Sequence, residues 1–301
     1  MTVNLTLLRA FHRVAQAGGF TAAARAAAVS QPTLSAQVRA LEAGYGVSLF
    51  DRRGRHIQLT PLGQRLLGIS ARLFAAEAEV RDLLGDAAVL AHGQLRVAAD
   101  SPTHVMPLLA ALKQRHAGLV FSLRTGNSSD VIRRVLEYEC DVGVMAKPVS
   151  DPRLHVLPIR DDRLVVFVPV HHRFARRRTL GMAELAGSDL VLRERGSITR
   201  EVFEARLADR AILPGRLLEV ETREAVREAV LAGFGVGVVF ESELGHDPAT
   251  RSLEVRDADL AVTEYLICLE ERRRLPLVES LFAIVRASIA ERDGTSAVSH
   301  S

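Results

Sequence analysis

Hydrophobic residues recur at helical spacing through the first 45 residues of the chain. The first such run predicts a helix over about 4–17 that ends at two consecutive glycines, with the apolar positions Leu5, Leu8, Phe11 and Ala15. Thr21 can cap a second helix over 22–28. Ser30 can cap a third helix, in which Pro32 is tolerated because the first-turn amides need no intrahelical partner. Three short helices in close succession are therefore expected.

The third predicted helix has one apolar face and one polar face. Leu34, Val38 and Leu41 follow a spacing of four and three and form a single buried face. The polar positions beside that face are Ser30, Gln31, Pro32, Thr33, Ser35, Gln37 and Arg39. In a helix-turn-helix, small polar residues near the start of the second helix reach base edges in the major groove of DNA. An ordinary solvated helix face is the alternative.

A basic turn follows the third helix. Residues 49–60, LFDRRGRHIQLT, place Arg52, Arg53 and Arg55 around a glycine between two short β-like pieces, which is typical of a wing that holds phosphates. Residues 1–60 contain seven arginines and two acidic residues, a charge of +5, whereas the whole chain carries +3. The N-terminal segment therefore favours a polyanion as partner, and the slightly acidic remainder does not.

The next segment carries an unbroken heptad stripe. Its apolar positions alternate in steps of four and three, and they are Leu62, Leu66, Ile69, Leu73, Ala76, Val80, Leu83, Ala87 and Leu90. With Thr60 and Pro61 at its start, the stripe predicts a helix over 61–90, about 40 Å long for roughly 28 residues. Such a helix is too long for its own small domain to cover, so it needs a partner helix, most simply that of a second copy. Packing against the chain's own C-terminal domain is the alternative.

From Gly93 onward, predicted strands and helices alternate. Buried strands are expected at GQLRVAA, LVFSLRT and CDVGVMA, with helices over about 103–116 and 128–139 between them. A second set has strands at RLVVFVPV, DLVLRE, RLLEVE and GVGVVF, and helices near 182–187, 197–210 and 222–233. The chain then returns through EYLICLE to a last helix at about 275–291. The predicted fold class is thus α/β, preceded by an all-α-type winged helix-turn-helix in residues 1–60. The effector domain, 91–301, has one lobe of about 91–162 and 266–291 and another of about 163–265.

Polar residues cluster where the predicted strands lead into helices. Because ligands bind beyond the carboxyl ends of strands, where helix N-termini converge, these residues are candidates for a ligand site. They are Asp100, Ser101, Thr103, His104, Thr125, Asn127, Ser128, Ser129, Ser197, Thr199, Arg200, Thr222 and Glu241. Free amides, hydroxyls and the Arg200 cation favour an anionic ligand, while Asp100 and Glu241 can face a ligand ammonium group. About half of Ser and Thr residues at such positions only cap helices.

The stretch FTAAARAAAVSQPTLSAQVRALEAGYGVSLFDRRGRHIQLTPLG resembles the winged helix-turn-helix of the LysR-type transcriptional regulators. In that family a recognition helix of the pattern SQ…LS…I/V-R-x-LE is followed by LF-x-R and LT-x-x-G. The order of the later domains is also similar, so the resemblance covers essentially the whole chain. Ala36 departs from the pattern, because many relatives have arginine there, and this leaves one phosphate or base contact without its usual side chain.

The resemblance implies a regulator that binds double-stranded DNA at an inverted-repeat operator as a homodimer, often paired into a homotetramer, with RNA polymerase among its partners. It also implies a two-lobed effector domain like the periplasmic binding proteins. The lobes are similar, through DSPTHVMPLLAAL, TGNSSDVI and RERGSITREVFEARL, to a LysR-type subgroup associated with aminoethylphosphonate catabolism. The implied effector is a small anionic or zwitterionic molecule such as 2-aminoethylphosphonate, with other small carboxylates or amino acids as alternatives.

Several other classes of protein and site are not expected. The sequence has no apolar run after a basic start and no stretch near about 18 apolar residues, so a cytoplasmic protein without a signal peptide or membrane span is predicted. Cys140 and Cys268 are expected as buried free thiols, with a redox pair as the alternative. No catalytic group, cofactor or metal site is predicted, since His171 and His172 lack a third ligand at metal spacing. An enzyme or a transport-type binder built on the two lobes is the alternative class, and turnover of a ligand would reveal the enzyme.

Overall fold

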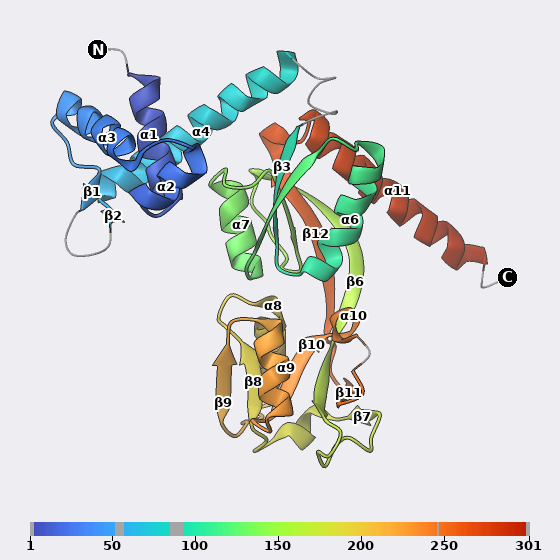
Figure 1. The fold of residues 1–301 in the computed structure, drawn as a ribbon. Coiled ribbons are helices and arrows are strands. Elements are labelled where there is room, and N and C mark those ends of the chain that lie inside the picture. Colours follow the sequence, from blue (N-terminus) through green and yellow to red (C-terminus); the bar gives the residue numbers. More distant parts are fainter. Residues whose placement is uncertain (1–2, 52–56, 85–92, 246, 299–301) are drawn as a thin grey trace. The chain divides into compact units, whose positions relative to one another are not determined.

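The computed structural model describes residues 3–51, 57–84, 93–245 and 247–298. The chain divides into a first compact unit, residues 1–85, and a second one built mainly by residues 86–136 and 140–301. Figure 1 shows the helical first unit and the α/β second unit. Within the described residues, no helix combines the length and the apolar character needed to cross a membrane.

The first unit begins with three helices, α1 (Leu5–Gln16), α2 (Phe20–Ala27) and α3 (Gln31–Tyr45). Their apolar faces meet in one core, whose fully buried members include Phe11, Val14, Leu34 and Val38. The helix α3 ends at Gly46, which adopts the left-handed conformation at φ 65° that terminates helices without steric cost. The expected apolar face of α3 is thus confirmed. In α1, Leu8 and Phe11 are buried as expected, but Leu5, the first residue of the helix, is 51% exposed.

The helix α2 differs from its prediction at its start. The expected cap, Thr21, lies inside the helix, which begins at Phe20 after Gly19, and no side chain caps it. The reason is packing, because Phe20 is 8% exposed and its ring lies 5.8 Å from that of Phe50. Burial of this aromatic ring in the core fixes the first helical residue one position before the polar residue that the sequence suggested.

Two short strands and a long helix complete the first unit. The strands β1 (Phe50–Asp51) and β2 (Gln58–Leu59) pair antiparallel, as expected at the base of a wing. Residues 52–56, and with them Arg52, Arg53 and Arg55, lie outside the described residues. The helix α4 spans Pro61–Leu84, and Thr60 Oγ1 accepts a hydrogen bond from the amide of Gly63 at 3.0 Å. The predicted continuation of this helix over 85–90 is also outside the described residues.

The helix α4 has two different faces. One face packs on the first unit through buried Ser70, Ala71 and Ala75 and half-buried Phe74. The heptad stripe lies on the other face, where four large apolar side chains are between 40% and 56% exposed. These are Leu62, Ile69, Leu73 and Val80. Among the described stripe residues only Leu66 joins the core of the unit.

The second unit is built on one sheet in which the strand order is β4-β3-β5-β12-β6-β10-β8-β9. One end holds the parallel strands β3 (Gln94–Ala99), β4 (Val120–Thr125) and β5 (Val142–Met145). The other end holds the parallel strands β8 (Leu190–Arg193), β9 (Leu217–Val220) and β10 (Val236–Phe240). Two long antiparallel strands, β6 (Leu154–Pro169) and β12 (Ala261–Leu269), join the two ends. Each end of the sheet becomes the centre of one lobe.

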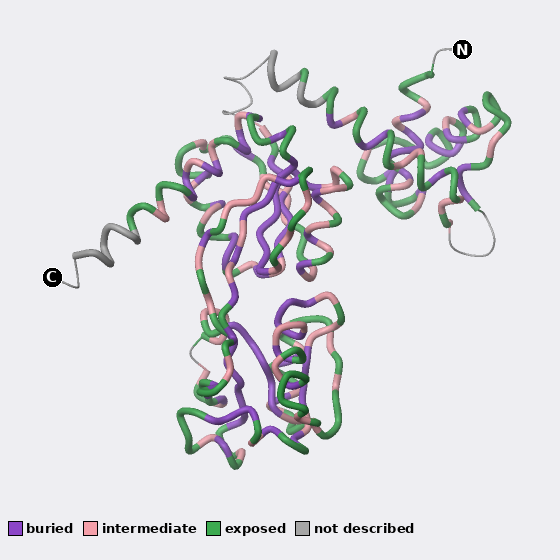
Figure 2. Tube along the Cα trace, turned by 180° about the vertical axis from the view of Figure 1, so that it is seen from behind, coloured by how far each residue is buried: buried purple, intermediate pink, exposed green. Residues whose placement is uncertain are grey.

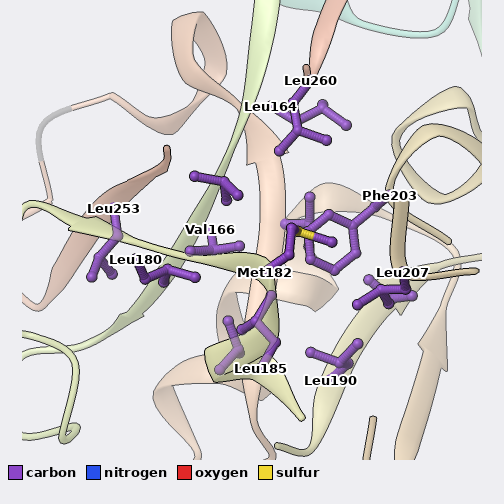
Figure 3. Packing of buried hydrophobic residues seen from close by; sticks show 14 of the residues in the cluster. Leu164, Val166, Leu180, Met182, Leu185, Leu190, Phe203, Leu207, Leu253 and Leu260 are labelled. Atoms are coloured by element: carbon purple, nitrogen blue, oxygen red, sulfur yellow. The ribbon is translucent and has the colours of Figure 1, made fainter. Parts of the chain in front are cut away.

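Each lobe has its own helices and core. In lobe I, α6 (Pro102–Arg115) and α11 (Pro276–Val298) pack on one face of the sheet, and α7 (Ser128–Leu136) packs against β5 and β3. In lobe II, α8 (Ile198–Asp209) and the short 3-10 helix Met182–Leu185 cover one face, and α9 (Arg223–Leu231) covers the other. Figure 2 shows buried positions along the central strands of both lobes, and Figure 3 shows Phe203, Met182 and Leu190 packed together in lobe II.

Some elements of the second unit were not predicted. The strand β6 starts at Leu154, well before the expected RLVVFVPV, and the strands β7 (Thr179–Leu180) and β11 (Thr250–Val255) were missed. The same is true of α10 (Glu241–Leu244), a single helical turn after β10. The final helix extends to Val298 instead of 291. Most of these segments are short or mix polar and apolar residues, so they give weak periodicity.

Two glycines of α4 provide a test of how the first unit is packed. A Cβ atom on Gly63 would lie 2.1 Å from the carbonyl oxygen of Leu49, whereas one on Gly68 meets no atom within 4 Å. We expect Gly63→Ala to lower the free energy of unfolding of this unit by about 1–3 kcal/mol through overpacking. Gly68→Ala should raise it by roughly 0.5–1 kcal/mol because alanine favours a helix. Thermal unfolding followed by circular dichroism measures both, and equal midpoints for the two variants would contradict the packing of α4 against Leu49.

Candidate functional site

The polar face of α3 begins at a well-formed helix cap. Ser30 Oγ accepts a hydrogen bond from the amide of Thr33 at 3.3 Å, and the two hydroxyl groups lie 2.7 Å apart. Gln31, Pro32 and Thr33 are exposed. Their exposure at the first turn of the second helix of the pair is the geometry with which helix-turn-helix proteins reach base edges.

Farther along α3 the polar residues differ in exposure. Arg39 is exposed and Gln37 is half-buried. Ser35 is only 8% exposed, contrary to the prediction that it points away from the core, and its hydroxyl accepts a hydrogen bond from the Arg39 guanidinium at 2.9 Å. Because Ser35 lies next to Leu34 on the inner side of the helix, it orients Arg39 instead of reaching a base itself.

A cleft of about 580 Å³ lies between the two lobes of the second unit. It is bounded by the N-terminal ends of α6, α7 and α9 and by the end of β8 and the residue that follows it. The residues that line it are Asp100, Pro102, Thr125, Gly126, Asn127, Asp130, Arg193, Glu194, Glu221, Thr222, Arg223, Glu224 and Glu243. A narrower recess beside it is lined by Ser101, Ser128, Ser197 and Thr199 together with Asp100, Asn127, Arg193 and Glu243.

Most of the polar residues predicted for a ligand site lie at this cleft or its recess. Thr103 is exposed beside them, 3.5 Å from a guanidinium nitrogen of Arg223. The Ser129 hydroxyl reaches across to the carbonyl oxygen of Gly196 in lobe II at 3.4 Å. Lobe I and lobe II therefore both contribute to the walls, as a cleft that binds a ligand between them requires.

Arg200 does not supply the expected cation. Its side chain is 6% exposed and is held inside lobe II by the carboxylates of Glu204 and Glu219 and by the carbonyl oxygen of Arg193. It lines neither the cleft nor the recess. Helical geometry explains the error, because Arg200 is three positions after the cap Ser197 and its side chain turns toward β8 and β9.

Glu241 and His104 also point elsewhere. Glu241 forms a two-pronged ion pair with Arg163, at 2.7 and 3.0 Å, outside the cleft. From α10, the carboxylate that lines the cleft is that of Glu243, two residues after Glu241. His104 is buried on the inner side of α6 against Ser242 and Glu264 and lines neither the cleft nor the recess.

Sequence reasoning missed the two cations of the cleft. Arg193 ends β8 and forms a two-pronged pair with Glu194, at 2.8 and 3.0 Å. Arg223 follows the cap residue Thr222 and spans the two lobes, since one guanidinium nitrogen lies 2.8 Å from Glu243 and 3.3 Å from the Ser101 hydroxyl. Their positions at a strand end and a helix start were the available signal. No sequence pattern indicated Glu243, because α10 is a single turn.

The cleft is more acidic than an anion site should be. Six carboxylates line it against two guanidinium groups, and both cations already pair with carboxylates. Burial raises the pKa of Asp100 to about 6, although the Ser128 hydroxyl at 2.6 Å and the Ala146 amide at 2.9 Å both stabilise its anion. Of the anionic and zwitterionic effectors that the sequence predicts, a simple anion is therefore not supported by the charge of the cleft.

Comparison with known proteins decides the family. Residues 5–64 match the model described as bacterial regulatory helix-turn-helix protein, lysR family, and residues 89–290 match the LysR substrate binding domain. The chain belongs to the LysR family. It is thus a DNA-binding transcriptional regulator with an effector-binding domain, as the resemblance of its N-terminal motif implied.

Individual LysR relatives agree with this assignment. The chain is 31% identical over 261 residues to the RuBisCO operon transcriptional regulator of Allochromatium vinosum, which is 86% of each sequence. The solved structure of full-length CbnR complexed with its target DNA is 26% identical, with a TM-score of 0.69 over 95% of this chain and 100% of that one. A full-length OxyR variant from Pseudomonas aeruginosa, 22% identical, shares the fold with a TM-score of 0.72 over 93% of this chain and 95% of that one.

Proposed function

We propose that this LysR-family regulator reads its operator as a dimer and responds to a small zwitterionic effector in the interlobe cleft. The observation that carries the proposal is the cleft itself, which combines uncapped helix N-termini with carboxylates. A homotetramer and a contact with RNA polymerase are expectations from the family and stay predictions.

The reading of bases is assigned to the first turns of α3. Gln31 and Thr33 are exposed there, and a glutamine amide can bind both N6 and N7 of adenine in the major groove. Arg39 is exposed farther along the helix, and Arg52, Arg53 and Arg55 of the wing supply phosphate contacts in this proposal.

Gln31→Ala should relax sequence preference at one position of the operator. The loss of a two-pronged base contact costs about 1–3 kcal/mol, or roughly 5-fold to 150-fold in affinity for the preferred base. Gln64→Ala, at an exposed position of α4, is the matched control and should leave affinity unchanged. Fluorescence anisotropy with an operator and its single-base variants measures the effect. Equal behaviour of the two variants would place base reading on another surface.

Dimer formation is assigned to the exposed stripe of α4. Four large apolar side chains on one face of a 24-residue helix need a cover, and a second copy of the same helix supplies a matching stripe. A two-fold dimer presents two α3 helices to DNA, which fits an inverted-repeat operator.

Leu73→Asp should dissociate the dimer, because it introduces a charge at the centre of the apolar stripe. Gln64→Asp, off the stripe, should not. Analytical ultracentrifugation reports the mass of each variant, and binding to an operator with two half-sites should fall much more than binding to a single half-site. A Leu73→Asp protein that sediments like the wild type would remove α4 from the interface.

The anionic end of the effector is assigned to the recess. Asn127 caps α7 and Thr222 caps α9 through hydrogen bonds to Asp130 and Ala225 amides at 3.0 and 3.1 Å. The caps of α6 and α8, Ser101 and Ser197, make no such bond. The first amides of α6 and α8 are therefore free of side-chain caps at the recess, where the helix dipoles favour a negative group.

The cationic end is assigned to Asp100 and Glu243. Both line the cleft and the recess, so an ammonium group there lies within a short molecule's length of the two helix starts. A ligand with both charges suits the net acidity of the cleft, whereas an anion alone adds to it. The molecule 2-aminoethylphosphonate is one candidate of this class.

A matched pair of ligands tests the charge requirement. We expect 2-aminoethylphosphonate, or another short zwitterion, to raise the melting temperature, since a ligand at 100 times its Kd stabilises by about 2.7 kcal/mol. Ethylphosphonate, which lacks the amine, should not.

Glu243→Gln should weaken binding of the zwitterion about 10-fold to 150-fold, while Glu241→Gln, outside the cleft, should leave it unchanged. Equal stabilisation by the simple anion would overturn the assignment.

A further inference from the structure

Four polar side chains meet in a buried cluster at α6. They come from four elements, with His104 on α6, Asp162 on β6, Ser242 on α10 and Glu264 on β12. The side chains of His104, Asp162 and Glu264 are at most 4% exposed. The His104 Nε2 atom lies 2.8 Å from the Ser242 hydroxyl, which also contacts Asp162, and Nδ1 is in close contact with Glu264. The chain of contacts therefore runs Glu264, His104, Ser242, Asp162.

The contacts fit an imidazole that carries two protons. A carboxylate only accepts hydrogen bonds, so the single hydroxyl proton of Ser242 goes to Asp162. The Ser242 oxygen then accepts from Nε2 of His104. With Nε2 protonated, a second ring proton on Nδ1 faces Glu264, whose two oxygens are buried and have no hydrogen bond from any other described group. Buried charges need such partners, and the geometry supplies them for a protonated imidazole.

The charged groups around His104 favour this protonated form. Burial opposes the charge on the ring, but the carboxylate of Glu264, followed by that of Glu243 on α10, raises the pKa of His104, and Arg160 on β6 acts in the opposite direction. Asp162 lies 3.9 Å from Nε2 and pairs with Arg160 at 3.4 Å. The remaining neighbour is the ring of Phe240, edge-on at 6.2 Å.

The cluster lies where the two lobes are joined. Its strands, β6 and β12, are the two that pass from one lobe to the other, and their pairing shifts register between Glu264 and Tyr265. Ser242 is the neighbour of Glu243, which lines the cleft from lobe II, and His104 is one helical turn from Ser101, which lines the recess from lobe I. A change in the cluster therefore acts on both walls of the cleft.

We propose that His104 is a proton-dependent link between the lobes, which holds α10 of lobe II against α6 of lobe I while its imidazole carries two protons. The link uses Ser242 as the connecting hydroxyl and Glu264 as the counter-ion. Loss of the proton removes the charge-assisted contact with Glu264 and frees the ring to rotate. The two walls of the cleft are then held less firmly in their relative positions. The inference does not depend on the identity of the effector.

A proton fits this cluster better than a metal ion. Donor atoms of His104, Asp162 and Glu264 lie within 4.8 Å of one another, a spacing that a divalent cation can use. However, each ring nitrogen already has a partner, Nδ1 with Glu264 and Nε2 with Ser242, on opposite edges of the ring. Asp162 and Glu264 are also balanced by Arg160 and the protonated imidazole, so no further positive charge is required.

The direction of the pH dependence follows from the raised pKa. A histidine whose pKa is higher in the folded protein stabilises the fold fully below its ordinary value of about 6.5, and this contribution is lost as the pH rises through the raised pKa. The link should therefore be closed below the ordinary pKa of histidine and should open as the pH rises through the raised pKa of His104.

Hydrogen exchange of the full-length protein tests the link. After correction for intrinsic exchange rates, peptides covering residues 160–165 and 260–265 should exchange about tenfold faster at pH 9 than at pH 6.5, as expected for the loss of one hydrogen bond to a charged group. Ser242→Ala keeps His104 against Glu264 but disconnects lobe II, so exchange should be fast at both pH values. Ser280→Ala removes the matched partner of His116 at 3.1 Å within lobe I and should behave like the wild type.

Nuclear magnetic resonance of ¹⁵N-histidine reports the proton directly. We expect one imidazole, identified by its absence in His104→Gln, to stay doubly protonated to a higher pH than an exposed histidine does, in the wild type and in Ser242→Ala. A neutral His104 ring at pH 6.5, pH-independent exchange in the wild type, or an unchanged pH response in Ser242→Ala would each overturn the link. Stoichiometric zinc retained after incubation and gel filtration, and lost in His104→Gln, would overturn it in favour of a metal site.

Discussion

The antiparallel pairing of β6 with β12 is the constraint on which the effector domain depends. Residues 154–163 of β6 pair with 261–269 of β12, and from Leu164 onward β6 pairs with β10 in lobe II. Both lobes therefore share one continuous strand, and their relative orientation is set by its bend and twist. The register shift at Glu264 and Tyr265 lies in this crossing, where such irregularities bend a strand and redirect its side chains.

The charge of the cleft follows from the way that the lobes place helix starts beside carboxylates. Helix N-termini carry partial positive charge. Those of α6, α7 and α9 line the cleft and that of α8 lines the recess, so acidic residues near them are electrostatically favourable. Burial nevertheless raises the pKa of Asp100 to about 6, which shows that the carboxyl group pays for its position through lost hydration. Arg223 partly compensates by pairing with Glu243 across the cavity. A ligand that carries both charges can replace these internal contacts without leaving a buried group unpaired.

Sequence reasoning succeeded where the local sequence pattern alone determines the secondary structure or the burial of a residue. The cap at Ser30, the apolar spacing of Leu34, Val38 and Leu41, and the antiparallel strands of the wing needed only local patterns, and the structure agrees with them. The helix starts of the effector domain were located for the same reason. The direction of individual side chains was harder to predict, because it depends on tertiary packing. Arg200 turns inward toward Glu219, Ser35 packs beside Leu34, and Glu243 lines the cleft although the sequence pointed to Glu241.

Arg223 limits the contacts by which an effector can change the spacing of the two lobes. Its guanidinium contacts Ser101 and Thr103 of lobe I and Glu243 of lobe II, so the structure already has an internal cation that joins the lobes. In the proposed mode of binding, the ammonium group of the effector competes with Arg223 for Glu243. A ligand shifts a conformational equilibrium only by the difference between its affinities for the two states. Replacing one internal cation by another at the same carboxylate gives little difference by itself. The anionic end of the effector, at the uncapped starts of α6 in lobe I and α8 in lobe II, must therefore supply the contacts that favour one spacing of the lobes over another.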